Sequence, residues 1–461
     1  MRSFDLFDTL LGRFHYSPES VFHSVAETFP FPLFPLYRMA AEARSNKTLP
    51  DIYRQLQELC GFSDEESAAL MRFEFETELS KIFPITENLN LVQDGDLIIS
   101  DTYYDVSQIR QILDRIGLKS QVQIYATPDG KASGRIWEQI KKEHALSTHL
   151  GDNKHSDVAS PKRHGIRGIH YANSQLSKSE RKMMQLGQTD LACLMRTLRL
   201  QNPYSPDLPE YLLWNDQCQI NLPILILASV YLDALCKKEG KRKILFTLRD
   251  GCLWIQLFRS LFPHYECIPF HSSRYIYSYP TPSYIKYVDS LYSEDAIIVD
   301  IQATGFSCRR FFENYFDGEP SYLTILGSSK YKKTRAIARV SKMWDAFEML
   351  NYDLIGTLYG FEENKPLRTL SEYDIKHVEP SHLCICKAVE LLSCFKLQSF
   401  DPRAIKWALN QTKNAHITKW IVPAKNHCHL FENGCMKHYS IFSDSSFVEI
   451  SKDSHSVLCQ H

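Results

Sequence analysis

Residues 3–11 read Ser-Phe-Asp-Leu-Phe-Asp-Thr-Leu-Leu, and this stretch decides the fold of the first part of the chain. A strand-like apolar start runs directly into Asp5, Asp8 and Thr9, although acidic residues are poor strand formers. At the carboxyl end of a parallel strand, such residues reach the crevice where open α/β sheets bind ligands. Taken alone, the stretch fits equally well a strand that ends in a turn, because Asp is a common turn residue.

Three later segments place further polar residues after apolar runs. One run ends in Ser100, and a Gly-Lys-Ala-Ser-Gly turn ahead of an amphipathic helix contains Lys131. A third strand-like run is followed by Gly-Asp-Asn-Lys-His-Ser-Asp, which supplies Asp152 and Asp157. These runs alternate with helical stretches up to about residue 171, and this alternation predicts a parallel, doubly wound α/β sheet.

In this order the four segments resemble the four-motif set of the haloacid dehalogenase superfamily, over about residues 1–175. The form that these motifs take in this chain is similar to the form found in a bacterial subgroup that acts in polysaccharide biosynthesis. The resemblance implies a Rossmannoid sheet with an inserted helical cap at about residues 14–92, and phosphatase chemistry. Asp5 would attack phosphorus and form an aspartyl phosphate, which divides one difficult step into two. Ser100 would hydrogen-bond a phosphate oxygen and Lys131 would neutralise charge, since such catalysis is mostly positioning and electrostatics.

The resemblance also implies a metal site and reveals one departure. Mg²⁺ prefers oxygen ligands, and the implied ligands are Asp5, Asp152, Asp157 and the backbone carbonyl of Phe7. Phosphatases of the superfamily usually carry a second Asp two positions after the nucleophile, where it protonates the leaving group. That position is Phe7 here, and a phenyl ring cannot donate a proton. Leaving-group protonation therefore falls to Asp8, to water, to a cap residue or to no group.

The segment between the first two motifs is predicted to be of largely helical character. Thr48 and Ser63 stand at expected helix N-caps, the second of them in a capping-box pattern. The charged residues Arg38, Arg72 and Glu78 lie on these helices, and we expect them to be ordinary solvated charges. A helical insertion at this point would cover the active site, exclude water and select the substrate.

A second α/β pattern occupies residues 205–461, with residues 176–204 as a helical and turn-rich linker before it. An apolar strand ends in Asp300, and the sequence from Thr304 to Ser307, Thr-Gly-Phe-Ser, then opens a helix. The glycine allows close backbone approach, and a helix N-terminus favours an anion. This segment is therefore a candidate phosphate cradle.

The cradle resembles the phosphoribosyl pyrophosphate loop of type I phosphoribosyltransferases. Val299 replaces the first acid of that loop, which leaves Asp300 to accept hydrogen bonds from ribose hydroxyls. An Arg-Asp-Gly turn at 249–251 follows another strand and would contact pyrophosphate. The implied substrate-binding residues are Arg249, Asp250, Arg274, Asp300, Thr304, Gly305 and Ser307. A strand, turn and helix of this kind is also a common capping arrangement, so an inert or differently employed α/β module stays open.

Composition narrows the class of protein. Of 461 residues, 44% are hydrophobic and 12% aromatic, which suffices for sizeable cores. The net charge of −1 implies no overall electrostatic attraction to nucleic acid or to membrane surfaces. The apolar stretch Ile220–Cys236 is interrupted by polar residues, so we expect a buried helix and no transmembrane segment. No signal-peptide pattern opens the chain, and we expect a cytoplasmic protein whose scattered cysteines are reduced thiols.

Cysteine and histidine residues also gather near the end of the chain, without a common zinc-site spacing. These residues are His427, Cys428, His429, Cys435 and His438. Cys384 and Cys386, further upstream, are expected to be buried small hydrophobes.

Phosphate chemistry in both halves predicts a bifunctional enzyme of glycan biosynthesis. One domain would transfer 5-phosphoribosyl from phosphoribosyl pyrophosphate to a saccharide acceptor, and the other would remove the 5-phosphate to give ribofuranose. One alternative is a phosphatase of a small sugar phosphate with a non-catalytic second domain. The other alternative is a catalytically lapsed scaffold or interaction protein, because Phe7 and Val299 depart from their motifs.

Overall fold

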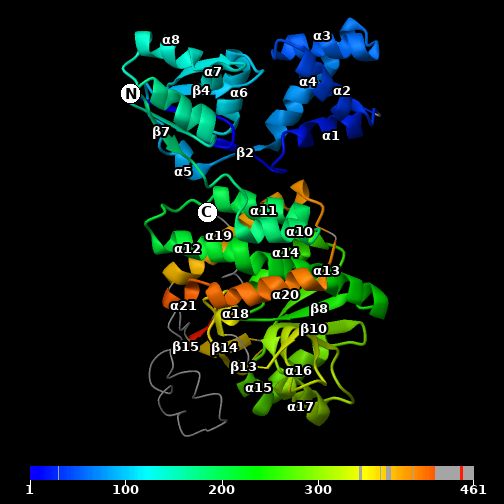
Figure 1. Cartoon of the computed structure of the whole chain (residues 1–461). Coiled ribbons are helices and arrows are strands. Elements are labelled where there is room, and N and C mark those ends of the chain that lie inside the picture. Colours follow the sequence, from blue (N-terminus) through cyan, green and yellow to red (C-terminus); the bar gives the residue numbers. More distant parts are fainter. Residues whose placement is uncertain are drawn as a thin grey trace. The chain divides into compact units, whose positions relative to one another are not determined.

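The structure is a computed structural model that describes residues 1–29, 31–341, 345–363, 365–369, 375–397, 399–420 and 447–449. The chain divides into two compact units (Figure 1). The first comprises Met1–Lys178 with Leu200–Pro203, and the second comprises Ser179–Arg199 with Tyr204–His461. Each unit is built around a five-stranded parallel sheet, so the two-domain α/β class expected from the sequence is confirmed.

The sheet of the first unit has the strand order β5-β4-β1-β6-β7, and all neighbouring strands are parallel. Its strands are β1 (Arg2–Phe4), β4 (Leu97–Asp101), β5 (Gln123–Thr127), β6 (Thr148–Gly151) and β7 (Arg167–His170). The chain leaves β1 for a strand on one side and leaves β6 for a strand on the other. A crevice for ligands is expected at the carboxyl ends of two such strands.

The two longer helices expected between these strands are present as α6 (Val106–Arg115) and α8 (Arg135–Glu143), with ends shifted by at most three residues. The sequence did not predict the shorter elements α5 (Thr86–Leu89), α7 (Gly130–Ser133), the π-helical turn η1 (Lys154–Ala159) and α9 (Ser160–Arg163). The core on one side of the sheet is built around Trp137 of α8, with Ile99 of β4 packed in the same cluster. Such apolar packing is the main source of stability for short helices.

The first two strands of the sheet are separated in sequence by a helical insertion (Figure 1). It contains α1 (Glu19–Thr28), α2 (Phe34–Arg44), α3 (Leu49–Cys60) and α4 (Asp64–Lys81). The antiparallel strands β2 (Leu11–Arg13) and β3 (Ile82–Pro84) pair where the chain enters and leaves it. The predicted N-caps form, because Thr48 accepts a hydrogen bond from the Asp51 N–H and Ser63 forms a capping box with Glu66.

The expectation that the charged residues of this insertion are solvated is correct for one of them and wrong for two. Arg72 is exposed, as expected. Arg38, in contrast, is fully buried and forms a bidentate ion pair with Glu74, at 2.8 Å for both bonds. Glu78 is 1% exposed and accepts a 2.8 Å hydrogen bond from Arg13. A buried charge requires a partner, and each of these two finds one on a neighbouring segment that sequence spacing does not reveal.

The sheet of the second unit has the order β12-β11-β10-β8-β9 and is also parallel throughout. Its strands are β8 (Lys243–Thr247), β9 (Glu266–Phe270), β10 (Ala296–Ala303), β11 (Tyr322–Ser328) and β12 (Arg335–Val340). The chain leaves β8 for β9 on one side and leaves β10 for β11 on the other. The crevice of this sheet is therefore expected at the carboxyl ends of β8 and β10.

The helices of the second unit lie on its sheet and in a helical layer that includes the expected linker. Before and between the strands lie α10 (Lys178–Gln185), α11 (Thr189–Leu200), α12 (Pro209–Asp216), the π-helical turn η2 (Gln217–Asn221), α13 (Leu222–Glu239), α14 (Cys252–Leu261), α15 (Arg274–Ser278), α16 (Pro282–Leu291) and α17 (Phe306–Tyr315). Residues 176–204 are thus mostly part of the second unit, where Arg199 of α11 pairs with the buried Glu180 of α10 at 2.7 Å.

One helical stretch of the described residues, Pro209–Glu239, is long and apolar enough to cross a membrane. It has a mean hydropathy of 1.6, and 78% of its most apolar window is buried inside the protein. This is the pattern of a core helix, so the buried helix predicted for Ile220–Cys236 is confirmed.

The remainder of the second unit adds a small antiparallel sheet and further helices. These elements are α18 (Asp345–Met349), β13 (Leu358–Glu362), β14 (Lys365–Thr369), α19 (Ile375–Leu391), the 3-10 turn η3 (Leu392–Cys394), α20 (Pro402–Gln411), the 3-10 turn η4 (Thr412–Asn414), α21 (Ile417–Trp420) and β15 (Phe447–Glu449). Cys384 is fully buried, as predicted, whereas Cys386 is partly exposed. His427, Cys428, His429, Cys435 and His438 lie outside the described residues.

Candidate functional sites

The polar residues singled out in the first unit meet in one cavity at the carboxyl ends of β1, β4, β5 and β6. The cavity has a volume of about 780 Å³. The predicted residues that line it are Asp5, Phe7, Asp8, Ser100, Lys131, Asp152 and Asp157. Met39, Glu42 and Lys47 line the same cavity from α2 and the turn after it, so the helical insertion forms part of its wall.

Lys131 is the centre of this site. Its Nζ atom lies 2.5 Å from Oδ1 of Asp5 and 2.7 Å from Oδ1 of Asp157. The lysine is 3% exposed and Asp5 is 6% exposed. Two residues that are 126 positions apart are therefore joined inside the protein. One ammonium group holds two buried carboxylates, an arrangement that a purely structural turn after β1 does not require.

The backbone around Lys131 is fixed by hydrogen bonds to neighbouring elements. Its N–H donates to Oδ1 of Asp101 at 2.9 Å, and its carbonyl accepts from Oγ of Ser160 at 2.6 Å and from the Trp137 indole at 3.2 Å. Asp101 also accepts a 2.6 Å hydrogen bond from the Thr127 hydroxyl. The end of β4 thus positions the turn that carries the lysine.

Asp157 is held by His149 of β6 and by the backbone of Asn153 after that strand, contacts that the sequence does not reveal. His149 Nε2 lies 3.2 Å from its Oδ1 atom, and the Asn153 N–H donates to its Oδ2 atom at 2.9 Å. The other ring nitrogen of His149 lies 2.8 Å from Oγ of Ser3. Burial lowers the pKa of His149, so a neutral ring with its proton on Nε2 satisfies both contacts.

Burial and neighbouring charges separate the three carboxylates of the site. Burial raises the pKa of Asp5 to about 7, an effect that Lys131 opposes and Asp157 reinforces. Burial also raises the pKa of Asp152 to about 6, with Asp8 and Asp157 adding to the shift. For Asp157, burial is outweighed by the hydrogen bond from His149 and the charge of Lys131, which hold its pKa well below the ordinary value. A second cation beside these carboxylates would therefore stabilise the ionised forms of Asp5 and Asp152 most.

The same three carboxylates could hold a metal ion. Ligand atoms of Asp5, Asp152 and Asp157 lie within 4.8 Å of one another. An oxygen-only donor set suits a hard divalent cation, although it does not select Mg²⁺ among such cations. Both Asp157 oxygens already accept hydrogen bonds from the protein, so Asp5 and Asp152 are the better direct ligands.

Ser100 adds an unsatisfied group to this cavity. It is 1% exposed, and within the described residues its Oγ atom has no hydrogen-bond partner. A buried hydroxyl without a partner is costly, so a ligand oxygen that accepts from it would be stabilised.

Phe7 and Asp8 lie where the sequence departs from the phosphatase pattern. The Arg13 guanidinium covers the Phe7 ring, with its carbon 4.4 Å from the ring centroid. Asp8 has a left-handed backbone with φ 53°, a conformation that Asp tolerates better than most residues. It lines the cavity and raises the pKa of Asp152. Asp8 thus lies close enough to Asp152 to affect its ionisation, whereas the Phe7 ring packs under an arginine.

The residues singled out in the second unit also meet in one cavity, at the carboxyl ends of β8 and β10. This cavity has a volume of about 220 Å³. The predicted residues that line it are Arg249, Asp250, Arg274, Asp300, Thr304, Gly305 and Ser307. Its position is the switch point of the sheet, where α/β proteins bind ligands.

The turn before α17 depends on its glycine. Gly305 has φ 69°, and a Cβ atom built on it would lie 2.7 Å from Oγ1 of Thr334. The Thr334 hydroxyl donates to the Thr304 carbonyl at 2.5 Å, which ties this turn to the start of β12. A side chain at position 305 is excluded both by the backbone conformation and by this contact.

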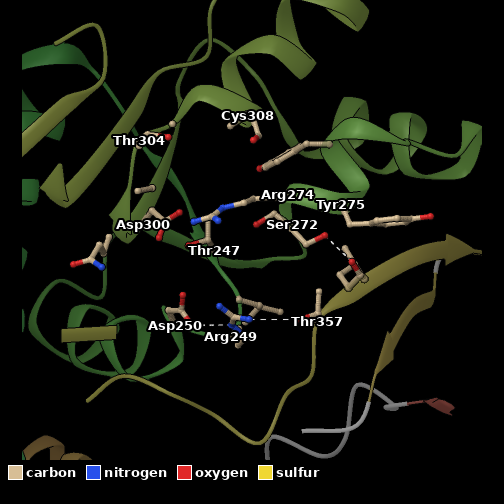
Figure 2. A pocket seen from close by; sticks show the side chains of 18 of the residues that line it. Thr247, Arg249, Asp250, Ser272, Arg274, Tyr275, Asp300, Thr304, Cys308 and Thr357 are labelled. Atoms are coloured by element: carbon tan, nitrogen blue, oxygen red, sulfur yellow. Dashed lines mark hydrogen bonds and ion pairs between the residues drawn. The ribbon is translucent and has the colours of Figure 1, made fainter. Parts of the chain in front are cut away.

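Charged side chains of both signs converge in this second cavity. In Figure 2 the Arg274 guanidinium extends toward Asp300, while Arg249 lies beside Asp250. Arg249 Nε is 3.1 Å from Oδ1 of Asp250, and the Tyr322 hydroxyl donates to Oδ2 of Asp300 at 2.7 Å. Burial raises the pKa of Asp300 to about 6, with Asp250 adding to the shift.

Several residues of the second cavity were not predicted. Thr247 ends β8, is 5% exposed, and within the described residues has an unpartnered hydroxyl. Its position at the end of an apolar strand is the signal that could have identified it. Glu348 and Arg368 reach the cavity from α18 and β14. No local pattern marks them, because the chain returns to the site only after the fifth strand of the sheet.

No protein-family model and no curated protein sequence matches this chain. The assignment of a function therefore rests on the motifs and on the geometry of the two cavities.

Proposed function

We propose that the first unit is a Mg²⁺-dependent phosphohydrolase of the haloacid dehalogenase type. The observation that carries the proposal is the pair of ion pairs by which Lys131 joins Asp5 and Asp157 at the carboxyl ends of the strands. The unpartnered Ser100 hydroxyl beside them supports it, since a phosphate oxygen would satisfy that group.

In this mechanism Asp5 attacks phosphorus, and the alkoxide of the sugar leaves. Lys131 offsets the charge of the phosphoryl group and of Asp5, while Ser100 donates a hydrogen bond to a phosphoryl oxygen. Asp5 and Asp152 would hold the metal ion, which would supply further positive charge at the phosphoryl oxygens. Water then hydrolyses the aspartyl phosphate. Asp8 is the group best placed to protonate the leaving oxygen, because it lines the cavity and Phe7 cannot act as an acid.

We propose that the second unit is a phosphoribosyltransferase. The turn from Thr304 to Ser307 would bind the 5-phosphate, and Asp300 would accept hydrogen bonds from ribose hydroxyls. Arg249 and Arg274 would bind the anionic leaving group. Support comes from the convergence of these residues at the switch point of a parallel sheet and from the steric need for Gly305.

Together the two activities would build a ribofuranose unit on a saccharide acceptor. The second unit would transfer 5-phosphoribosyl and release pyrophosphate, and the first would then remove the 5-phosphate. A cytoplasmic location stays a prediction. The alternatives are a sugar-phosphate phosphatase with a binding module, and a scaffold without activity. The raised pKa of Asp5 and the unsatisfied Ser100 favour an active site over a scaffold, because such perturbed groups gather at functional sites.

The deciding experiment is incubation of the full chain with phosphoribosyl pyrophosphate and Mg²⁺, with pyrophosphate and inorganic phosphate measured separately. In parallel, ribose 5-phosphate serves as substrate for the first site alone. Hydrolysis of ribose 5-phosphate without binding of phosphoribosyl pyrophosphate would leave the phosphatase with a binding module. Absence of both would favour the scaffold.

A further inference from the structure

The second cavity contains a carboxylate that the proposed transfer reaction has not yet used. Glu348 lies on the short helix α18, which packs against β10. It lines the same cavity as Asp300 and the turn from Thr304 to Ser307. The helix therefore brings a third acid to the place where the ribose and the acceptor would meet.

The other two acids of this cavity are already engaged. Asp250 receives an ion pair from Arg249, and Asp300 receives a hydrogen bond from Tyr322. Within the described residues, the carboxyl group of Glu348 accepts no hydrogen bond. Among the described residues, the charges that act most strongly on it are those of Arg249 and Asp250 after β8, Arg274 on α15 and Asp300 on β10. Glu348 is thus a partly buried carboxylate with its lone pairs available to a ligand.

We propose that Glu348 is the general base that accepts the proton of the acceptor hydroxyl during phosphoribosyl transfer. The inference rests on the proposed function of the second unit. The acceptor oxygen forms a bond to C1 of the ribose as the bond from C1 to pyrophosphate breaks. The hydroxyl proton moves to the Glu348 carboxylate, and pyrophosphate departs with the electron pair of the broken bond. Atoms and charge balance without a further reactant.

The electrostatic setting of Glu348 suits this role. Burial raises its pKa to about 7, with Asp250 raising it further and Arg249 and Arg274 opposing the shift. A base whose pKa lies near the working pH combines a sizeable ionised fraction with the greatest driving force for proton transfer. Asp300 is less suitable, because the Tyr322 hydroxyl already occupies one of its oxygens.

The test uses simple alcohols as acceptors and the variant Glu348→Gln in the full chain. Wild type is incubated with phosphoribosyl pyrophosphate, Mg²⁺ and either methanol or 2,2,2-trifluoroethanol, and the alkyl riboside 5-phosphate is quantified by mass spectrometry. We expect Glu348→Gln to lower transfer to methanol by about 10²–10³-fold. The more acidic trifluoroethanol needs less help from a base, so its loss should be at least tenfold smaller.

Two further readouts separate a base from a structural residue. Glu348→Gln should bind phosphoribosyl pyrophosphate with an affinity within about threefold of wild type in calorimetry, and the acidic limb of the pH–rate profile should disappear. Glu313→Gln is the matched control, because Glu313 is exposed on α17. It should leave both alcohols unaffected.

Each other outcome is decisive. Equal losses for both alcohols, unchanged transfer in Glu348→Gln, or no alkyl riboside from a wild type that binds phosphoribosyl pyrophosphate would overturn the role of Glu348 alone. A wild type that does not bind phosphoribosyl pyrophosphate would instead overturn the transferase function, and this inference with it.

Discussion

The Nζ atom of Lys131 lies 2.5 Å from Oδ1 of Asp5, and both side chains are almost entirely buried. This contact joins the end of the first strand of the sheet to the turn after its third strand. It keeps a carboxylate available in a place where burial would otherwise favour the neutral acid. In the proposed phosphohydrolase, the same ammonium group would stabilise the negative charge of a bound phosphoryl group.

Replacing this ammonium group should damage both folding and catalysis. Lys131→Met keeps much of the side-chain volume but leaves Asp5 and Asp157 without their shared cation. Removing one partner of a buried ion pair typically costs about 3–5 kcal/mol. We expect a loss of that size in the free energy of unfolding, measured by urea denaturation, together with loss of phosphatase activity. Lys141→Met on the exposed side of α8 is the control, and an equally stable Lys131→Met would show that the ion pairs are unimportant.

The nucleophile itself should be replaceable at little structural cost. Asp5→Asn retains the shape and leaves Lys131 paired with Asp157, so stability should change by no more than about 1 kcal/mol. Turnover of ribose 5-phosphate should fall by at least about 10³-fold, because amide nitrogen and oxygen do not form the aspartyl phosphate. Mass spectrometry of acid-quenched wild type should detect a phosphorylated Asp5 peptide. Full activity in Asp5→Asn would exclude the nucleophile role, and Asp114→Asn on α6 controls for a surface carboxylate.

A single methyl group added at Gly151 should disturb the first site. A Cβ atom on Gly151 would lie 2.4 Å from the carboxyl carbon of Asp157. Gly151→Ala should therefore displace Asp157, loosen its contact with Lys131 and lower phosphatase activity by at least about tenfold. Gly95→Ala is the control, because an added Cβ there meets nothing within 4 Å, although its φ of 85° adds backbone strain. Comparable activity in the two variants would contradict the steric argument.

The turn before α17 should be equally sensitive in the second unit. Gly305→Val forces an unfavourable backbone conformation and collides with Thr334. Calorimetry should show loss of phosphoribosyl pyrophosphate binding, whereas hydrolysis of ribose 5-phosphate at the first site should persist. Binding that survives in Gly305→Val would remove the phosphate-cradle assignment.

The buried Asp300 predicts a specific pH dependence of stability. Its pKa rises from 3.8 to about 6 on folding, so the folded state binds the proton more tightly than the unfolded state. Its contribution is therefore present below pH 3.8 and is lost as the pH rises through about 6. Relative to Asp300→Asn, which does not titrate, wild type should lose on the order of 2–3 kcal/mol of unfolding free energy between about pH 4 and pH 7. Urea denaturation at several pH values measures this difference, and a constant difference would contradict the pKa shift.

The sequence predicts best those residues that directly follow an apolar strand. Asp5 and Asp152 are of this kind, and Ser100 lies in the last two residues of β4, at the end of the sheet where ligands bind. His149 is hidden because it lies inside β6 and reads as an ordinary strand residue. Glu348 is hidden for a different reason, since only the three-dimensional return of α18 brings it to the cavity.

The buried ion pairs of the helical insertion could likewise not be predicted from the sequence. Arg38 has the spacing of a surface residue, and its partner Glu74 lies 36 positions later on another helix. Periodicity reports which face of a helix is apolar, but not that two charged residues from different helices will neutralise each other. The caps at Thr48 and Ser63 are local, and for that reason they could be predicted.

The different strand orders of the two sheets bear on the origin of the protein. Numbered along the chain, the first sheet runs third, second, first, fourth, fifth, and the second sheet runs second, first, third, fourth, fifth. A tandem gene duplication would have copied one order into both halves. The two strand orders therefore argue against an origin of the chain by tandem duplication of a single half.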